Sequence, residues 1–384
     1  MIYLRGTTDF NIEESTVITF GKFDGIHRGH RLLLDTVLEK KADDLKAVVF
    51  TFDIPPRKKV EDDRGDVLTT NEEKMHIFEN IGIDYVVECP FTEEIRNMDA
   101  VDFIRMMVEK LHVKYMVVGT DFHFGHNRMG DYQLLLEYAD KFGYEVQVIE
   151  KIQSDGRDIS STYIREYIKE GNIEKANELL GYSFFVQGIV EHGNEIGRTI
   201  GFPTVNLVPE ADKLLPPFGV YITKILIGGE EYCGITNVGC KPTIEGDNPI
   251  GVETHVLDFS DDVYDMAVEV EFLHRIRAEV KFASIDELKA QLQQDIKIVI
   301  LVEHGEDIKT LEDVYFWQNP RKHEIRWKTV NGRKVKTVCS EKAVDGMQLY
   351  KSLCTIRDRY NVDFVFCEKS ETGKKIVEIL NDGR

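Results

Sequence analysis

Two histidines stand where a strand-like run meets a helix-like run. In TFGKFDGIHRGHRLLL, residues 19–34, His27 and His30 follow a β-branched run and precede an apolar one. The first residues of a helix present N–H groups without helical partners and the positive end of the helix dipole, which favour phosphate. Two imidazoles there can donate hydrogen bonds and stabilise charge on an attacked α-phosphate. Because the motif is short, the two histidines could instead pack in the core or lie on the surface. A metal site is not favoured, since no third metal-type ligand lies nearby at a recognised spacing.

A second segment with hydroxyls and a cation lies at another predicted helix start. ISSTYIR, residues 159–165, supplies Ser160, Ser161, Thr162 and Arg165. The hydroxyls can cap the helix or bind phosphate, and the guanidinium can clamp a phosphate or face solvent. By itself this segment favours an ordinary N-cap. Together with the two histidines it favours a phosphate site.

A third candidate lies in HGNEIGRTIGFPTVNL, residues 192–207. Its glycines recur every four residues and predict a loop whose amides fold over phosphates: Gly193, Gly197 and Gly201. No Walker sequence follows them. Thr204 and Asn206 alternate along an extended segment and therefore share a face. Their oxygens suit a Mg²⁺ ion that already carries ATP phosphates. Turn residues at the rim of a barrel are the alternative.

A carboxylate in a later strand adds a candidate base. Glu253 lies in VETHVLDF, residues 252–259. At a barrel strand it could accept the proton of an alcohol during phosphoryl transfer. A solvent-facing strand glutamate is the ordinary alternative, and neighbouring histidines show no metal pattern.

The elements that must position the first candidates alternate along the chain. Strand-like runs occur at 16–20, 46–52, 84–89, 114–119 and 144–150, and helical patterns occur at 31–42, 72–82, 100–111 and 131–143. This alternation predicts a parallel sheet with helices on both faces and ligands at the carboxyl ends of its strands. Two short helices follow at 160–171 and 172–181.

The pattern changes after residue 182. Strands without intervening helices are predicted at 183–193, 219–229, 231–239, 253–259 and 266–277, which is typical of a small antiparallel barrel. A helix over 284–305 begins with a Ser284-x-x-Glu287 capping box.

Residues 306–384 predict a third, small α+β unit. A hairpin over 324–338 turns at Asn331-Gly332, and a helix, a strand and a helix follow at 343–360, 363–368 and 370–380. The cations of the hairpin suit an acidic or nucleic-acid partner, or simply blunt an edge strand. The second interpretation is favoured.

Composition narrows the class of protein. The 384 residues require two or three domains. A net charge of −20 argues against general binding to nucleic acid or anionic membranes, although local donors can still bind phosphate. The six cysteines form no C-x-x-C, so zinc frameworks are not predicted. The absence of a leader-like or membrane-spanning run predicts a cytoplasmic protein.

Together these segments resemble the prokaryotic bifunctional riboflavin kinase/FAD synthetases. GKFDGIHRGHRLL, VVGTDFHFGHNRMGD and SSTYIREYIKEGNIEKANELLGYSF match the adenylyltransferase half, an H-x-G-H nucleotidyltransferase. The resemblance implies that His27 and His30 bind ATP phosphates and that Gly25 lies against the nucleotide. It also implies a phosphate site completed by Ser161, Thr162 and Arg165, with Asp121 and Phe124 near the flavin and nucleotide. One departure from the family pattern is Lys22, at a position where many relatives carry a neutral residue.

The second half resembles the kinase domain of the same family. GRTIGFPTVNL, PPFGVYITKI, NVGCKPTI, ETHVLDF and RIRAEVKFASIDELKAQLQQDI match in order and spacing. The resemblance implies that Thr204 and Asn206 hold Mg²⁺-ATP and that Glu253 deprotonates the ribityl 5′-hydroxyl. Val205 and Lys241 depart from the usual Ala and Arg. The resemblance covers about residues 1–300 and leaves the extension unrecognised.

We therefore expect a Rossmann-like FMN adenylyltransferase domain (1–182), an antiparallel β-barrel riboflavin kinase domain (183–305) and an α+β extension of unknown role (306–384). The expected reactions convert riboflavin to FMN and FMN to FAD, each with ATP and Mg²⁺. Riboflavin, FMN, FAD and ATP are the expected partners. An enzyme with one silent site is an alternative, although both sets of residues are present. A flavin- or nucleotide-binding regulator is another, supported by the basic hairpin alone.

Overall fold

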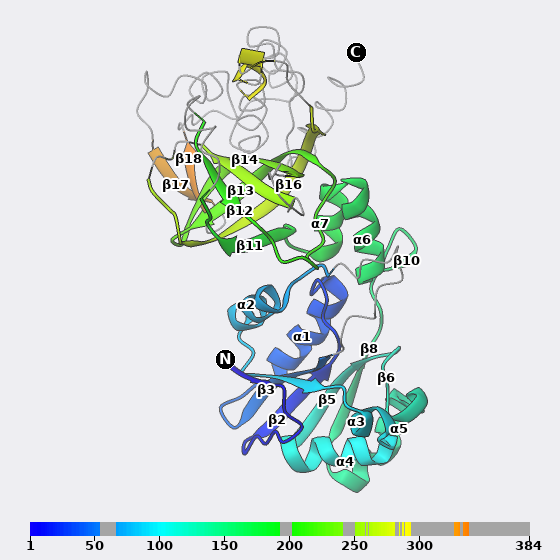
Figure 1. Ribbon diagram of the computed structural model, residues 1–384. Helices are drawn as coiled ribbons and strands as arrows, with labels where there is room; N and C mark the ends of the chain where they lie inside the picture. Colours follow the sequence, from blue (N-terminus) through cyan, green and yellow to red (C-terminus); the bar gives the residue numbers. More distant parts are fainter. Residues whose placement is uncertain are drawn as a thin grey trace, which may run out of the picture. The chain divides into compact units, whose positions relative to one another are not determined.

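The computed structural model describes residues 1–53, 67–192, 202–240, 250–257, 259, 261–280, 284, 286–287, 289–292, 326–330 and 333–337. The chain divides into two units (Figure 1). The first comprises Met1–Phe184 and Glu210–Pro216, and the second comprises Phe185–Pro209 and Pro217–Arg384. The chain therefore leaves the first unit after Phe184 and returns to it for one short segment.

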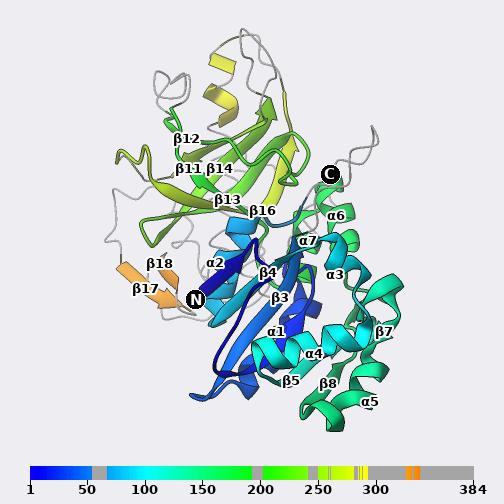
Figure 2. The ribbon, with the colours of Figure 1, turned by 60° about the horizontal axis from the view of Figure 1, so that its bottom comes forward.

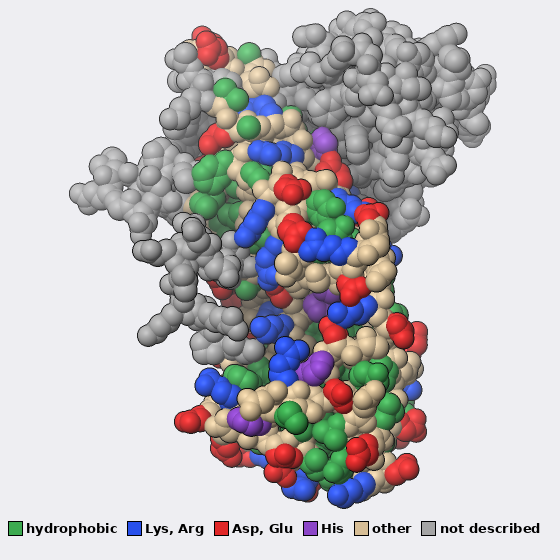
Figure 3. Space-filling view, turned by 90° about the vertical axis from the view of Figure 1, so that its right-hand side faces the viewer, with side chains coloured by type: hydrophobic (Ala, Val, Ile, Leu, Met, Phe, Trp, Pro, Cys, Tyr) green, Lys and Arg blue, Asp and Glu red, His purple; other side chains and the backbone are tan. Residues whose placement is uncertain are grey.

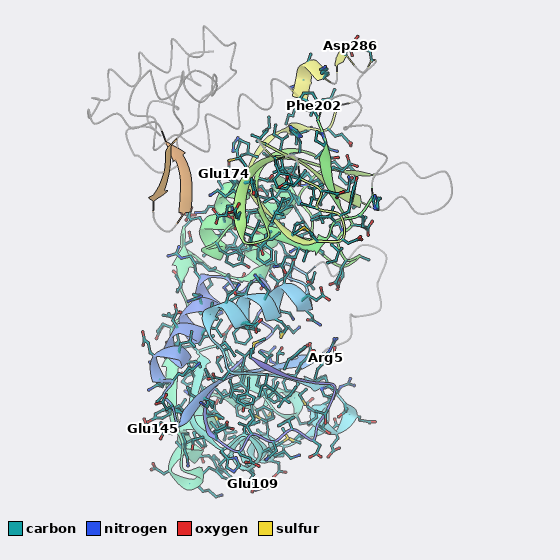
Figure 4. The ribbon with its side chains drawn as sticks, turned by 90° about the vertical axis from the view of Figure 1, so that its left-hand side faces the viewer. Arg5, Glu109, Glu145, Glu174, Phe202 and Asp286 are labelled. Carbon is teal, nitrogen blue, oxygen red and sulfur yellow. The ribbon has the colours of Figure 1, made fainter. Side chains whose placement is uncertain are left out.

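A six-stranded parallel sheet forms the centre of the first unit, as predicted. Its strand order is β1-β4-β3-β2-β5-β8. The strands are β1 (Ile2–Arg5), β2 (Ser15–Phe20), β3 (Leu45–Asp53), β4 (Tyr85–Pro90), β5 (Val113–Gly119) and β8 (Glu145–Ile149). The edge strand β1 was not predicted, because it is short and its side chains are exposed or only half-buried. Arg5, labelled in Figure 4, fixes it to β4 through an Nε–Oε2 distance of 2.9 Å to Glu88.

Helices cover both faces of this sheet (Figures 1 and 2). The helices of the first unit are α1 (Arg28–Lys40), α2 (Asn71–Ile81), α3 (Glu93–Asn97), α4 (Ala100–Leu111), α5 (Tyr132–Phe142), α6 (Ser161–Glu170) and α7 (Ile173–Leu180). Short pieces complete the unit: β6 (His123–Phe124), η1 (His126–Arg128), β7 (Gly130–Asp131), β9 (Gln153–Ser154) and β10 (Arg157–Asp158). The short α3 was not predicted.

Strand alternation divides the core of the first unit into two clusters. Ile18 and Phe50 point to one face, where they join Phe103 of α4 and other buried side chains. Their neighbours Val17 and Val49 point to the other face, where α1 and α2 cover them. Because both faces are buried, the strands read as continuous apolar runs, which is the pattern of a covered parallel sheet.

The second unit contains a six-stranded antiparallel sheet in the order β11-β16-β13-β14-β15-β12. Its strands are β11 (Phe185–Ile189), β12 (Thr204–Leu207), β13 (Gly219–Ile227), β14 (Glu230–Cys240), β15 (Ile250–Val256) and β16 (Ala267–Ala278). The N–H of Glu191 donates to the carbonyl of Asn206 at 2.9 Å and joins the two ends of this order. The predicted antiparallel arrangement is present, and in the described part of the chain its ends meet at this bridge.

The predicted helix after the sheet and the predicted extension are described in part. Residues 286–287 and 289–292 are helical, and Glu287 N–H donates to Ser284 Oγ at 3.2 Å. In the extension, β17 (Arg326–Val330) pairs with β18 (Arg333–Thr337), with Val330 opposite Arg333. The turn residues Asn331 and Gly332 and the predicted elements at 343–360, 363–368 and 370–380 lie outside the described residues.

Two observations describe the surface of the described residues. No helix among them is long and apolar enough to cross a membrane. On the face that Figure 3 shows, acidic and basic side chains are interspersed rather than gathered by sign. The negative charge of the chain is therefore not concentrated on that face.

A chain of buried hydroxyls joins three strands of the antiparallel sheet. Thr236 Oγ1 lies 2.8 Å from Thr223 Oγ1 and 2.8 Å from Thr254 Oγ1. All three threonines are fully buried. A Cβ added at Gly234 would lie 2.7 Å from a methyl group of Thr254, so glycine makes room for the hydroxyl chain.

We predict that Thr236→Val lowers the free energy of unfolding by about 1–3 kcal/mol, because it leaves two buried hydroxyls without their shared partner. Replacing all three threonines with valine should recover much of this loss, since no buried hydroxyl then remains unpaired. Urea unfolding of both variants measures the difference. A triple variant that is less stable than Thr236→Val would contradict the interpretation.

Candidate active sites

A left-handed turn lies between β2 and α1, at the carboxyl end of the parallel sheet. Phe23, Gly25 and Ile26 have φ angles of 49°, 81° and 34°. Positive φ is unfavourable for phenylalanine and more so for β-branched isoleucine. Both side chains are buried in the cluster beneath α1 and α2, so packing holds the turn. A Cβ added at Gly25 would lie 2.6 Å from Leu68 Cδ1, so this position requires glycine.

Asp24 connects this turn to two distant segments of the same unit. Its Oδ1 accepts hydrogen bonds from the N–H groups of Leu68 at 2.7 Å and Thr69 at 3.2 Å. Its Oδ2 pairs with the guanidinium of Arg165. The hydroxyl of Ser161 donates to the carbonyl of Asp24 at 2.8 Å. The amino-terminal turns of α1 and α6 therefore lie side by side, as a site for one polyanion requires.

Two further contacts fix the glycine of the turn. Gly25 N–H donates to Thr69 Oγ1 at 3.0 Å, and Tyr182 donates its hydroxyl proton to the Gly25 carbonyl at 2.6 Å. Neither Thr69 nor Tyr182 was predicted as a site residue. A lone threonine and a lone tyrosine carry no local signal for such contacts, since each depends on the tertiary fold.

The two predicted histidines lie against each other. Their rings stack with centroids 3.7 Å apart, and the ring of His30 also contacts Phe23. His27 is the N-cap of α1, and its Nδ1 accepts the N–H of His30 at 3.3 Å. Because Nδ1 is an acceptor, Nε2 carries the proton of the neutral ring and is the available donor.

Burial keeps both imidazoles uncharged near neutral pH. It lowers the pKa of His27 to about 4 and lowers the pKa of His30 well below its ordinary value. Among the described residues, His30 Nδ1 is buried and has no hydrogen-bond partner. Such an atom costs about 1–3 kcal/mol unless a ligand supplies the partner. The pair therefore offers directed hydrogen bonds rather than positive charge.

The segment after β9 and β10 shows which of its hydroxyls caps α6. Ser160 is the N-cap of α6 and accepts the N–H of Tyr163 at 3.3 Å. Ser161 donates to the carbonyl of Asp24, Arg165 pairs with the carboxylate of Asp24, and Thr162 is exposed in the first turn of α6. Of the three hydroxyls, that of Ser160 caps the helix.

Asp121 and Phe124 lie beyond the end of β5. Asp121 is exposed, and its Oδ2 lies 3.1 Å from Lys151 Nζ. Phe124 is buried, with its ring 5.3 Å from Phe122 and 5.4 Å from Phe103. No described contact joins either residue to the histidine pair. Phe124 is therefore part of the core that shapes this end of the sheet.

A second row of candidates crosses the antiparallel sheet. Asn206 of β12 is paired with Glu253 of β15, which is paired in turn with Asn237 of β14. Residues in register on neighbouring strands share a face and have Cβ atoms about 5 Å apart. Thr204 shares this face with Asn206, and Asn206 Nδ2 donates to the Thr204 carbonyl at 3.3 Å. Sequence reasoning did not single out Asn237.

The next residue of β15 on this face is His255, which packs against an aromatic ring. His255 is paired with Thr204, and its Nδ1 donates to the Pro203 carbonyl at 2.8 Å. The ring of Phe202, labelled in Figure 4, lies 5.3 Å from that of His255. Burial lowers the pKa of His255. The predicted loop glycines Gly193, Gly197 and Gly201, and Lys241, lie outside the described residues.

The donor set of this row suits a hard divalent cation. Among the described residues, no group of three or more His, Cys, Asp and Glu side chains forms a metal cage. Thr204 and Asn206 instead offer hydroxyl and amide oxygens, and the carboxylate of Glu253 lies beside them in the row. Mg²⁺ commonly binds few such ligands, together with water and substrate phosphates. The residues present therefore fit Mg²⁺ that arrives with a nucleotide.

Comparisons with known proteins agree in both halves of the chain. Residues 9–163 match the family described as FAD synthetase, and residues 180–301 match the family described as riboflavin kinase. The bifunctional riboflavin kinase/FMN adenylyltransferase of Escherichia coli K12 is 38% identical over 287 residues, which are 74% of this chain and 91% of that protein. The protein of the same description from Haemophilus influenzae is 37% identical and covers 77% of this chain and 97% of its own length.

A solved structure is also similar. It is described as a macrolide-efflux protein from Streptococcus pneumoniae and is 31% identical to this chain, with a TM-score of 0.68. The match covers 78% of this chain and 98% of that one. The shared fold therefore extends over both units rather than over one of them.

We predict that buried His27 makes the protein less stable in mild acid. Well above pH 6.5, the ordinary pKa of histidine, the ring is neutral in both the folded and the unfolded chain. As the pH falls toward 4 the unfolded chain takes up the proton first, so His27 lowers stability by up to about 3 kcal/mol. His27→Asn keeps an N-cap acceptor and does not titrate. Thermal midpoints between pH 8 and pH 4 should fall more steeply for the wild type. Parallel profiles would contradict this.

Proposed function

The chain belongs to the family of bifunctional riboflavin kinase/FMN adenylyltransferases, and from this we propose how its residues divide the two reactions. Residues 183–305 phosphorylate riboflavin with ATP, giving FMN. Residues 1–182 transfer the AMP moiety of a second ATP to FMN, giving FAD and pyrophosphate. The observation that carries the assignment is the stacked histidine pair at the start of α1, with its partnerless buried nitrogen.

In adenylyl transfer, a phosphate oxygen of FMN attacks the α-phosphorus of ATP. A new P–O bond forms, the bond to the bridging oxygen of the β-phosphate breaks, and pyrophosphate leaves. His27 Nε2–H and His30 donate hydrogen bonds to ATP phosphate oxygens, and Ser161, Thr162 and Arg165 complete the phosphate site. Since both imidazoles are neutral, the work is positioning and directed hydrogen bonding.

The remaining predicted residues of this unit receive supporting roles. Gly25 lies against the nucleotide, in a left-handed turn where a Cβ would collide with Leu68 and which therefore keeps this position free of a side chain. Asp121 and Phe124 border the flavin and the nucleotide. The closely packed rings around Phe124 give that border a rigid apolar wall.

In the kinase reaction, Glu253 accepts the proton of the ribityl 5′-hydroxyl as the hydroxyl oxygen attacks the γ-phosphorus, and ADP leaves. Thr204 and Asn206 hold the Mg²⁺ that accompanies ATP. That ion neutralises phosphate charge. The pairing of Asn206 with Glu253 supports these roles, because it places the proposed base beside a residue proposed to bind Mg²⁺-ATP. Gly193, Gly197 and Gly201 supply the loop amides. Since both reactions consume ATP, we also place the protein in the cytoplasm.

We predict that the two activities can be removed separately. His30→Ala should lower FAD formation from FMN by about a hundredfold or more, through lost transition-state hydrogen bonding, and spare FMN formation from riboflavin. Glu253→Ala should do the reverse. Purified protein is incubated with ATP, Mg²⁺ and either flavin, and FMN and FAD are followed by chromatography.

Matched controls lie in the same units. His76→Ala removes a histidine that contacts Asn80 on α2, and Glu269→Ala removes a sheet carboxylate that contacts Gln187. Both controls should keep both activities. If either His30→Ala or Glu253→Ala silences both reactions in a folded protein, the division of labour is wrong. A wild-type protein that turns over neither flavin would exclude the enzyme interpretation.

A further inference from the structure

A lysine outside the predicted sites is buried in the first unit. Lys213 lies in the segment Glu210–Pro216, which follows β12 in the chain but packs with the first unit. Its side chain is 1% exposed. Its ammonium donates to the Leu68 carbonyl at 2.8 Å and to Glu73 Oε2 at 2.5 Å. It also lies 4.6 Å from the centre of the Phe184 ring. A lysine this deeply buried is rare without such partners.

Glu73 holds the other end of this contact. Its Oε2 accepts the N–H of Thr70 at 2.9 Å, while Thr70 Oγ1 accepts the N–H of Glu73 at 3.2 Å. This capping box starts α2. Main-chain bonds add to it, because Val67 N–H donates to the Asp212 carbonyl at 2.8 Å and Leu214 N–H donates to the Val67 carbonyl at 2.9 Å. The segment Glu210–Pro216 therefore holds the backbone of residues 67–70 in place.

Leu68 connects Lys213 to the candidate adenylyl-transfer site. Its carbonyl accepts from Lys213, and its N–H donates to Asp24 Oδ1 at 2.7 Å. The following residue, Thr69, donates its N–H to the same oxygen and accepts from Gly25. Asp24 then pairs with Arg165. The backbone of one residue and one carboxylate therefore separate the ammonium of Lys213 from the guanidinium of Arg165.

Stability alone does not account for a buried lysine–glutamate pair. Desolvating both charges offsets most of their attraction, and an apolar pair of similar size commonly gives equal or greater stability. A fixed cation does what an apolar side chain cannot, because it sets the direction of a carbonyl. The N–H and the carbonyl of Leu68 are both held, one by Asp24 and the other by Lys213, which sets where Asp24 and the glycine turn lie.

We propose that Lys213 is a positioning residue of the adenylyl-transfer site and acts on Arg165 and the glycine turn through Leu68 and Asp24. The inference rests on the proposed function of that site. It means that the segment following the kinase strand with Thr204 and Asn206 supplies part of the framework for the other reaction.

The test uses the full chain and separates charge burial from positioning. Lys213→Met and Glu73→Gln each leave one buried charge without its partner, so both should be destabilised strongly. The double variant removes both charges, and the amide oxygen of the introduced glutamine can still accept from Thr70. The Leu68 carbonyl stays without its donor. The control is Lys41→Met, since Lys41 also donates to one carbonyl and one carboxylate, Gly82 and Asp84, each at 2.8 Å.

The double variant should regain most of the thermal midpoint that either single variant loses. Its kcat for FAD formation from FMN should still fall by about tenfold or more, with KM for ATP within about threefold, since misplaced donors weaken the transition state most. FMN formation from riboflavin should match the wild type in the double variant, and Lys41→Met should match it in both reactions.

A double variant that makes FAD with the wild-type kcat overturns the proposal. Equal loss of both activities overturns it as well, because that pattern indicates general damage to the fold. A wild-type protein that makes no FAD would instead contradict the proposed function. The two failures are therefore distinguishable in the same experiment.

Discussion

The carboxylate of Asp24 is the contact on which the first site depends. It receives two main-chain N–H groups from residues 68 and 69 and one guanidinium from α6. The turn that contains it includes two bulky residues at positive φ, each of which costs of order 1–3 kcal/mol. That conformation persists because buried packing and these hydrogen bonds offset the strain. If Asp24 released its partners, the turn and the two helix starts would no longer share one place.

The electrostatics of this site come from fixed dipoles more than from charge. His27 and His30 are neutral, and the charge of Arg165 is balanced by Asp24. The proposed phosphate site therefore combines N–H groups at two helix starts and two oriented ring nitrogens with the hydroxyls of Ser161 and Thr162 and a guanidinium whose charge Asp24 balances. Such donors need no reorganisation when charge develops on a transferring phosphate. Under the proposed function, an acidic protein binds its polyanionic substrates mainly through oriented donors.

Sequence patterns predicted the elements better than the contacts between them. Apolar runs and helical spacing placed the parallel sheet, and the motif placed His27 and His30 at the start of α1. The pairing of Asp24 with Arg165 joins residues 141 positions apart, which periodicity does not encode. Lys213 lies in a polar, proline-rich stretch, where a lysine is normally exposed. The alternation of side chains along a strand predicted that Thr204 and Asn206 share a face. It could not predict the strand register that brings Glu253 beside them.

The second site is assembled by a different means, because register alone creates its row. Asn206, Glu253 and Asn237 come together only while β12, β15 and β14 keep their alignment. A slip of one residue would turn a strand's side chains to the opposite face. On that opposite face, Thr236 and Thr254 share a hydroxyl contact that the same slip would break, leaving buried oxygens unpaired. The buried threonines thus act against slippage beneath the row. The first site resists change through contacts between distant segments, and the second through penalties that neighbouring strands impose on each other.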